Sequence, residues 1–285
     1  MTVLIDGMKG FGDNIYQRAF IKSFKEDVYI KTPWPELYQD LDNVKVVRSD
    51  TTLRTQALNE KRHSKEIWHN HPTNARRITV QYGTQDLKQG SIISGMQRCL
   101  GVAPSKFDLP DFGESQVKNE KPIAVIRPAT VRSEWRADSR NPNPQYLELA
   151  AAILSERGYH VVSVAHLQDK QEWMVGKQPY ADEVYHQGEF KPDELLALVS
   201  SAACVVGGVG WIVPACFASG TDLYCVLGGN GGNNSPKVIT PKGKHRIHYE
   251  YPDDYCMCQV PQHNCNKKIT GFEDKFTAWI NTLTH

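Results

Sequence analysis

Apolar residues along the first hundred positions form either short continuous runs or sets at helical spacing. The continuous runs, which are typical of buried strands, cover 2–5, 28–31, 44–48 and 77–82. Apolar residues at helical spacing predict helices over 14–25 and 91–100, and Gly101 is placed to cap the second. A short helix is predicted to open near Pro35. The pattern indicates successive β-α units.

The second half repeats this alternation after a break. Residues 102–121 are polar, contain proline and lack periodicity, which is typical of a linker. Beyond them, strands are predicted over 123–126, 160–165, 204–207 and 223–227, and helices over 144–157, 191–202, 211–219 and 270–284. We therefore predict two domains, 1–118 and 119–285.

Alternating strands and helices predict the α/β fold class, with parallel sheets covered by helices on both faces. Ligands of such doubly wound sheets bind beyond the carboxyl ends of the strands. We expect two Rossmann-like domains that face each other across a cleft, and a last amphipathic helix that packs back onto the fold.

The overall charge does not favour a nucleic-acid or membrane partner. The 285 residues include 33 Lys and Arg against 32 Asp and Glu. The amino-terminal sequence has neither a signal-peptide pattern nor an apolar run of membrane-spanning length, so we expect a cytoplasmic protein without stable membrane insertion.

The first chemical signal is the glycine-rich turn after the first strand. Gly7, Gly10 and Gly12 follow a G-x-x-G-x-G order, and glycine permits positive φ and close approach of a ligand. The turn resembles a dinucleotide fingerprint, but its glycine order differs and the next strand, 28–31, ends without the acidic residue that binds ribose. An NAD-dependent oxidoreductase is therefore disfavoured.

Asp13 ends this turn and carries two interpretations. Its carboxylate is placed to bind backbone N–H groups at the start of the following helix. A carboxylate at the mouth of a cleft could also act as a general base toward an acceptor hydroxyl. The two roles are compatible.

A second glycine-rich turn follows the strand at 204–207. Gly207, Gly208 and Gly210 precede Trp211 and an apolar helix, so backbone N–H groups from Gly208 to Trp211 could bind a diphosphate. A tight β-α turn without a ligand is the plain alternative.

Two further segments follow predicted strands of this domain. Arg127, Arg132, Arg136 and Arg140 could contact a diphosphate, and Arg127 and Arg132 lie nearest the strand end. Gly228 and Gly229 begin a run that is interpreted either as a mobile loop over a donor or as a solvated loop.

The seven cysteines fall into two groups. Four lie in apolar surroundings typical of reduced core residues: Cys99, Cys204, Cys216 and Cys225. Cys256, Cys258, His263 and Cys265 could hold zinc, but the C-x-C spacing differs from the common C-x2-C knuckle. We expect a local structural role for these four and no required metal.

Two charged segments are expected to be solvated. Residues 51–79 hold six Lys or Arg against two Glu beside several aromatic residues, and a phosphate-bearing acceptor or a nucleic acid is the alternative partner. Asp40 and Asp42 form the D-x-D pair, which is expected to lie in a solvated turn of the first domain.

In its order of motifs, the chain resembles the glycosyltransferase family 9-like group that includes the ADP-heptose:lipopolysaccharide heptosyltransferases. The resemblance spans nearly the whole chain and rests on 10–13, 127–129, 207–229 and the late cysteines. It implies a GT-B architecture, with Asp13 as the catalytic aspartate and an acceptor side at Lys9, Gly10, Phe11 and Gly12. The second domain would bind the nucleotide-sugar.

The chain also departs from that family. The common Asp-x-Gly-x-x-His pattern for donor phosphates is replaced by residues 208–213, which contain neither Asp nor His. The chain is short, so a divergent member, including one of viral origin, is one interpretation.

These observations predict a glycosyltransferase that moves a sugar from a nucleoside-diphosphate sugar to an acceptor hydroxyl and requires no further cofactor. A glycan and a modified DNA base, the latter in a phage enzyme, are the alternative acceptors. A degenerate nucleotide-binding module without catalysis is the competing class.

Overall fold

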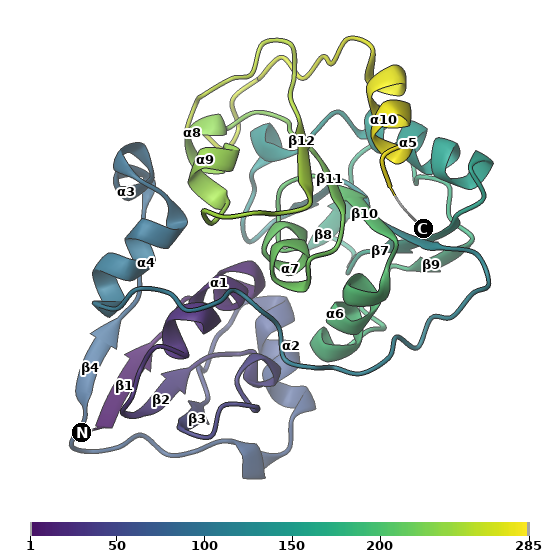
Figure 1. Ribbon diagram of the computed structural model, residues 1–285. Helices are drawn as coiled ribbons and strands as arrows, with labels where there is room; N and C mark the ends of the chain where they lie inside the picture. Colours follow the sequence, from purple (N-terminus) through teal and green to yellow (C-terminus); the bar gives the residue numbers. More distant parts are fainter. Residues whose placement is uncertain (1, 284–285) are drawn as a thin grey trace. The chain divides into compact units, whose positions relative to one another are not determined.

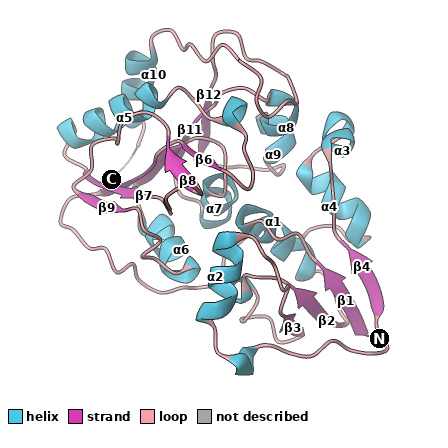
Figure 2. Ribbon diagram, turned by 180° about the vertical axis from the view of Figure 1, so that it is seen from behind, coloured by secondary structure: helices cyan, strands magenta, loops and turns pink. Residues whose placement is uncertain are grey.

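The structure is a computed structural model that describes residues 2–283. The chain divides into two compact units: unit 1 runs to Asp111 and includes Val238–Pro241, and unit 2 holds the rest of the described chain. The division lies inside the polar 102–121 segment, which contains no helix or strand. Figure 1 shows the course of the chain, and Figure 2 shows its helices and strands from behind.

Unit 1 contains one parallel sheet with strand order β3-β2-β1-β4. Its elements are β1 (Thr2–Asp6), α1 (Phe11–Ile21), β2 (Asp27–Lys31), the 3-10 helix η1 (Pro35–Leu37), β3 (Val44–Val47), α2 (Arg54–Arg62), η2 (Lys65–Ile67), β4 (Arg76–Thr79), α3 (Thr84–Gln89) and α4 (Ile92–Leu100). The strand order reverses beside β1, because β2 and β3 lie on one side of it and β4 on the other.

Unit 2 contains a larger parallel sheet with strand order β12-β11-β10-β5-β7-β9 and an antiparallel β6–β8 pair. Its elements are β5 (Ile123–Arg127), β6 (Thr130–Arg132), η3 (Asp138–Arg140), α5 (Pro144–Glu156), β7 (His160–Val164), β8 (Glu172–Met174), β9 (Glu183–Tyr185), α6 (Pro192–Ser201), β10 (Cys204–Gly207), α7 (Ile212–Ser219), β11 (Leu223–Val226), α8 (Gly231–Asn234), α9 (Pro236–Ile239, at the junction with unit 1), β12 (Ile247–Glu250) and α10 (Phe272–Ile280). Here the strand order reverses between β5 and β10.

The predicted α/β class is confirmed, and the local signals act as expected. Asn143 accepts a hydrogen bond from the Gln145 N–H at the start of α5, and Pro144 occupies its first position. Gly101 ends α4 in the left-handed conformation, with φ of 71°. Apolar runs in strands and capping residues at helix ends thus mark most of the elements in the sequence.

The last helix packs within unit 2. Phe276 and Ile280 of α10 join a buried cluster with Leu147 of α5, and the ring of Tyr224 meets Phe276 edge-on at 4.8 Å. α10 ends at Ile280, whereas the predicted end, Thr284, lies outside the described residues.

The differences from the sequence-based prediction in unit 1 include the start of α1 and the whole of α2. α1 begins at Phe11 rather than at residue 14, because the Asn14 N–H already bonds to the Gly10 carbonyl at 3.0 Å. α2 was missed because its buried residues are polar, so no apolar stripe marks it. One of these, Glu60, accepts a hydrogen bond of 2.9 Å from the Ser49 N–H.

Other differences involve short or edge elements. β9, β12 and the β6–β8 pair were not predicted, because these short strands contain charged or polar residues and form no continuous apolar run. Among the four cysteines expected in the core, Cys99 is only half-buried, and its thiol donates to the Gln81 carbonyl at 3.1 Å. The other three are buried.

Candidate functional site

The turn between β1 and α1 is held by buried polar side chains of α1. Asn14 donates to the Met8 and Gly10 carbonyls at 2.6 and 2.8 Å, and the Gln17 carbonyl oxygen accepts from the Met8 N–H at 3.0 Å. Asn14 and Gln17 are fully buried. Buried amides of this kind order the backbone because an unpaired amide in that place would be costly. The turn is therefore a rigid platform.

Asp13 lies in the first turn of α1, and Gly10 is the residue that caps the helix. The Tyr82 hydroxyl, which follows β4, donates a hydrogen bond to Oδ1 of Asp13. Burial and the neighbouring Asp13 carboxylate both raise the pKa of Tyr82 well above its usual value, so the phenol remains a donor. Asp13 and Tyr82 thus meet beyond the carboxyl ends of β1 and β4, where the strand order reverses.

Sequence reasoning missed Tyr82. It lies outside the glycine-rich turn and far from Asp13 in sequence, and only the pairing of β1 with β4 brings the two together. The only available signal was its place directly after a predicted strand.

Gly10 is required for steric reasons. A Cβ atom there would lie 2.3 Å from Oδ2 of Asp13, and a Cβ at Gly7 would lie 2.6 Å from Nε2 of Gln17. Although glycine permits positive φ, none of Gly7, Gly10 and Gly12 adopts it. They leave room for polar side chains of α1 that fold back over the turn.

The remaining acceptor-side residues form the outer part of this turn. The Lys9 carbonyl accepts a hydrogen bond of 2.8 Å from Trp34 Nε1, and the Phe11 ring packs on the Trp34 ring at 4.7 Å. Gly12 is inside α1. A contact of Lys9, Gly10, Phe11 and Gly12 with an acceptor stays a prediction.

In unit 2, Arg127 ends β5 beside the turn that follows β10. A Cβ atom at Gly210 would lie 3.2 Å from a terminal nitrogen of the Arg127 guanidinium. Arg127 is half-buried, and within residues 2–283 it has no ion-pair partner. Burial lowers the pKa of Arg127 to about 10, so it remains charged at neutral pH. This places a guanidinium that forms no ion pair within residues 2–283 where the strand order of the sheet reverses.

The surroundings of Arg127 carry excess positive charge. The charges of Arg140 and Arg132 also lower its pKa, and the charge of Glu172 opposes them. Arg132 pairs with the buried Glu172 at 2.6 Å. The mutual repulsion of these guanidinium groups favours an anionic ligand beside Arg127.

Arg136 does not join this group. Its guanidinium pairs with Asp138 at 2.8 Å and is exposed. Of the four predicted arginines, the structure gathers Arg127, Arg132 and Arg140.

A pocket opens at the carboxyl ends of β5, β7 and β9. Its walls include both polar and aromatic residues: Arg127, Thr130, Arg132, His166, Glu172, Tyr185, Glu189, Phe190 and Trp211. His166, Tyr185, Glu189 and Phe190 were not predicted, because they follow the strands that lack glycine motifs. Small-molecule sites commonly combine aromatic walls with a set of placed polar groups, and four charged side chains line this pocket.

The glycines of the second turn lie against protein atoms. A Cβ at Gly207 would come within 2.7 Å of the Ile212 side chain, and one at Gly208 within 2.7 Å of Pro142. Both glycines are buried. They are explained by packing, and a contact with a donor diphosphate stays a prediction.

The run that starts at Gly228 is not a solvated loop, so that interpretation is wrong. Residues 226–231 are buried, and residues 231–234 form α8. A Cβ atom would lie 2.1 Å from the Asn141 carbonyl oxygen at Gly228 and 2.2 Å from Cys265 Sγ at Gly229. At both glycines, protein atoms occupy the place where a side chain would stand. A contact of Gly228 or Gly229 with a donor stays a prediction.

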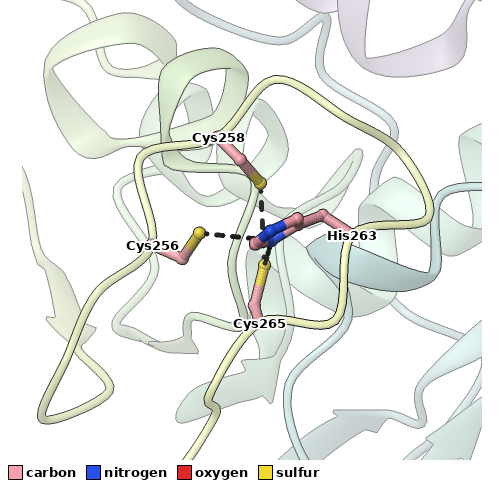
Figure 3. Close-up of side chains that lie close together, drawn as sticks. All are labelled: Cys256, Cys258, His263 and Cys265. Atoms are coloured by element: carbon pink, nitrogen blue, oxygen red, sulfur yellow. Dashed lines mark hydrogen bonds between the residues drawn. The ribbon is translucent and has the colours of Figure 1, made fainter.

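The late cysteine cluster comes together in space. Cys256, Cys258, His263 and Cys265 each offer one ligand atom, and these four atoms lie within 4.8 Å of one another (Figure 3). All seven cysteines are free thiols.

The two charged segments behave differently. Most basic residues of 51–79 are exposed, as expected. Asp40 is not simply solvated, because it forms two hydrogen bonds of 2.7 and 2.6 Å with the buried Arg18.

In the described part of the chain, no helix is both long and apolar enough to cross a bilayer.

No protein-family model and no curated protein match this chain. Solved structures do match in fold. The iron-containing dodecameric glycosyltransferase TibC of enterotoxigenic E. coli is 14% identical, with a TM-score of 0.66 over 99% of this chain and 75% of TibC. TibC has also been solved with ADP-D-β-D-heptose.

Two further structures share the fold. The ADP-heptose lipopolysaccharide heptosyltransferase II of E. coli is 16% identical, with a TM-score of 0.57 over 99% of this chain and 98% of its own. A glycosyltransferase family 9 protein of Veillonella parvula is 10% identical, with a TM-score of 0.54 over 87% and 85%. The chain therefore has the fold of heptosyltransferase-type glycosyltransferases. These are bacterial proteins, and they give no support to a viral origin.

Proposed function

We propose that this protein is a glycosyltransferase that moves a sugar from a nucleoside-diphosphate sugar to an acceptor hydroxyl. The observation that carries the proposal is the unpaired, half-buried guanidinium of Arg127 at the reversal point of the unit 2 sheet. Such reversal points bind nucleotides in doubly wound folds. The shared fold with ADP-heptose-dependent enzymes supports the same assignment.

In the proposed reaction, Asp13 takes the proton from the acceptor hydroxyl as its oxygen attacks the anomeric carbon. Tyr82 donates a hydrogen bond to Oδ1 of Asp13, and this bond orients the carboxylate for the proton transfer. The bond between the sugar and the diphosphate breaks, and its electron pair leaves with the diphosphate.

Unit 2 would stabilise that leaving group. Arg127 supplies a fixed positive charge, and the backbone N–H groups from Gly208 to Trp211 supply dipoles. No divalent ion takes part in this scheme. In this scheme, unit 1 binds the acceptor and unit 2 binds the donor.

The ligands of similar solved structures indicate which nucleotide to test first. TibC and another E. coli heptosyltransferase, WaaC, have been solved with ADP-heptose, ADP or an analogue. An adenosine diphosphate sugar is therefore the first donor to test. Among acceptors, we place a glycan first and a modified DNA base second.

The test joins nucleotide binding to turnover. Melting temperature is measured with ADP, UDP and GDP, because a ligand of the folded state raises it. Release of nucleoside diphosphate from ADP-heptose is then measured with glycan and DNA acceptors. Binding without donor consumption would instead support a non-catalytic nucleotide-binding module, and a response to NAD(P) alone would support the oxidoreductase class.

The matched variants are Arg127→Gln and Arg136→Gln. Arg127→Gln is expected to weaken ADP binding about 10- to 100-fold, since a hydrogen bond to a charged group contributes about 1.5–3 kcal/mol. Arg136→Gln is the control, because its guanidinium is exposed and already paired with Asp138. Equal ADP affinity in both variants would contradict the donor site proposed here.

A further inference from the structure

The cluster of Cys256, Cys258, His263 and Cys265 has the dimensions of a tetrahedral metal site. His263 Nδ1 lies 3.5 Å from Cys256 Sγ and 3.3 Å from Cys265 Sγ, and Cys258 Sγ lies 3.6 Å from Cys265 Sγ. Bonds of about 2.3 Å to sulfur and about 2.0 Å to nitrogen give tetrahedral edges of about 3.8 Å for S–S and about 3.5 Å for S–N pairs. These three separations are close to the tetrahedral edges, and all four ligand atoms lie within 4.8 Å of one another.

A disulfide does not account for the cluster. The Cys258 and Cys265 sulfurs are 3.6 Å apart, well beyond the bonded distance of about 2.05 Å. Three thiols and an imidazole around one centre form a common ligand set of structural zinc. The same soft donors also suit iron.

The surrounding backbone shows what such an ion would hold together. The Gly231 and Gly232 N–H groups of α8 donate to the carbonyls of Cys256 and Cys258 at 2.9 and 3.1 Å. At Gly229, the sulfur of Cys265 fills the place where a side chain would stand. The cysteine segment is therefore packed directly on the 228–234 run of unit 2.

A third segment meets the same cluster loop. The Ser139 N–H donates to the Pro261 carbonyl at 2.9 Å, and Lys267 Nζ donates to the Asp138 carbonyl at 2.8 Å. η3, which contains both Asp138 and Ser139, thus rests on the loop. The ligands themselves lie outside helices and strands, so no backbone ladder of a helix or sheet holds them in place.

We propose that Cys256, Cys258, His263 and Cys265 bind one zinc or iron ion, which fastens this loop to the 228–234 run and to η3. The closed set of four protein ligands makes the ion structural rather than catalytic. The expectation of no required metal is replaced by this proposal. It does not depend on the proposed sugar transfer.

Metal content is the first measurement. Protein purified from cells grown with both zinc and iron is analysed by elemental mass spectrometry. The expected result is about one zinc or iron per chain, falling more than about tenfold in Cys258→Ser. Cys99→Ser is the matched control and should keep the metal, since Cys99 lies outside the cluster. Less than a tenth of an ion in the wild-type protein would overturn the proposal.

A second measurement on the wild-type chain covers the case in which Cys258→Ser fails to fold. Apoprotein is prepared with a chelator and titrated with cobalt(II), which shows strong visible bands only in tetrahedral sites. A thiol reagent is applied before and after metal removal. Three further cysteines should become reactive in the apoprotein. Absence of the tetrahedral spectrum, or an unchanged thiol count, would contradict the site.

Discussion

The turn after β1 and the turn after β10 both lie where the strand order of their sheet reverses, and both lead from glycine into a helix. Their charges are opposite. The first presents the carboxylate of Asp13, and the second lies beside the guanidinium of Arg127. In neither turn do the glycines of the motif have positive φ. Two turns of the same β-α type therefore present opposite charges, and the neighbouring side chain determines the sign of the charge.

The glycines of the two turns also differ in what they make room for. At Gly10, the missing side chain leaves space for a short carboxylate that is bonded to Tyr82. At Gly210, it leaves space near the far end of a long arginine side chain. A short, anchored group cannot give way without leaving its hydrogen-bonded position, whereas a long side chain can give way near its far end. Substitutions at these positions should therefore separate the two roles.

The largest effect on turnover is expected from a substitution of Asp13, the proposed general base. Asp13→Asn should lower kcat by about 10²- to 10⁴-fold, because the amide cannot accept the acceptor proton. Melting temperature and ADP affinity should stay near those of the wild type. The measurement is nucleoside diphosphate release under donor and acceptor saturation.

Asp42→Asn is the matched control for that experiment. Asp42 is an exposed carboxylate of the same unit and belongs to the D-x-D pair. Its variant should retain full activity. If Asp13→Asn also retained it, another group would have to be the base.

The next effect is expected from moving the carboxylate without removing it. Gly10→Ala places a Cβ 2.3 Å from Oδ2 of Asp13 and must displace that oxygen. A shift of about 1 Å in a reacting group costs about 10²-fold in rate. Steady-state kinetics should show this loss in kcat with little change in donor affinity.

Gly83→Ala serves as the control for Gly10→Ala. A Cβ at Gly83 would meet no atom within 4 Å, and its φ of −136° suits any residue. Its activity should match that of the wild type. An equal loss in both variants would show that the rate depends on the stability of unit 1 rather than on the place of Asp13.

The smallest effect is expected in the second turn. Gly210→Ala brings a Cβ to 3.2 Å from the Arg127 guanidinium, which can give way by a few tenths of an ångström. ADP affinity, measured by calorimetry, should change less than about threefold, in line with a free-energy change within about 0.5 kcal/mol. A loss comparable to that of Arg127→Gln would instead show that the Gly210 backbone itself approaches the diphosphate.

The two halves of the chain also differ in how well their sequences predicted the structure. In unit 2, the Cys204–Gly207 strand was predicted with its observed bounds, because buried parallel strands form continuous apolar runs. In unit 1, α2 went unseen, since it buries Asn59 and Glu60 through hydrogen bonds instead of apolar packing. Polar burial leaves no periodic signal.

The sequence by itself determined the α/β class, the order of the main strands and helices, and the identity of Asp13 and Arg127 as groups that follow strands. Only the tertiary structure decided which groups meet. Tyr82 reaches Asp13 because β4 pairs with β1, and Arg132 and Arg140 lie close enough to Arg127 to lower its pKa. The four soft ligands converge in the same way. Periodicity records the environment of each residue along its own element, whereas such sites depend on strand order and loop packing between distant elements.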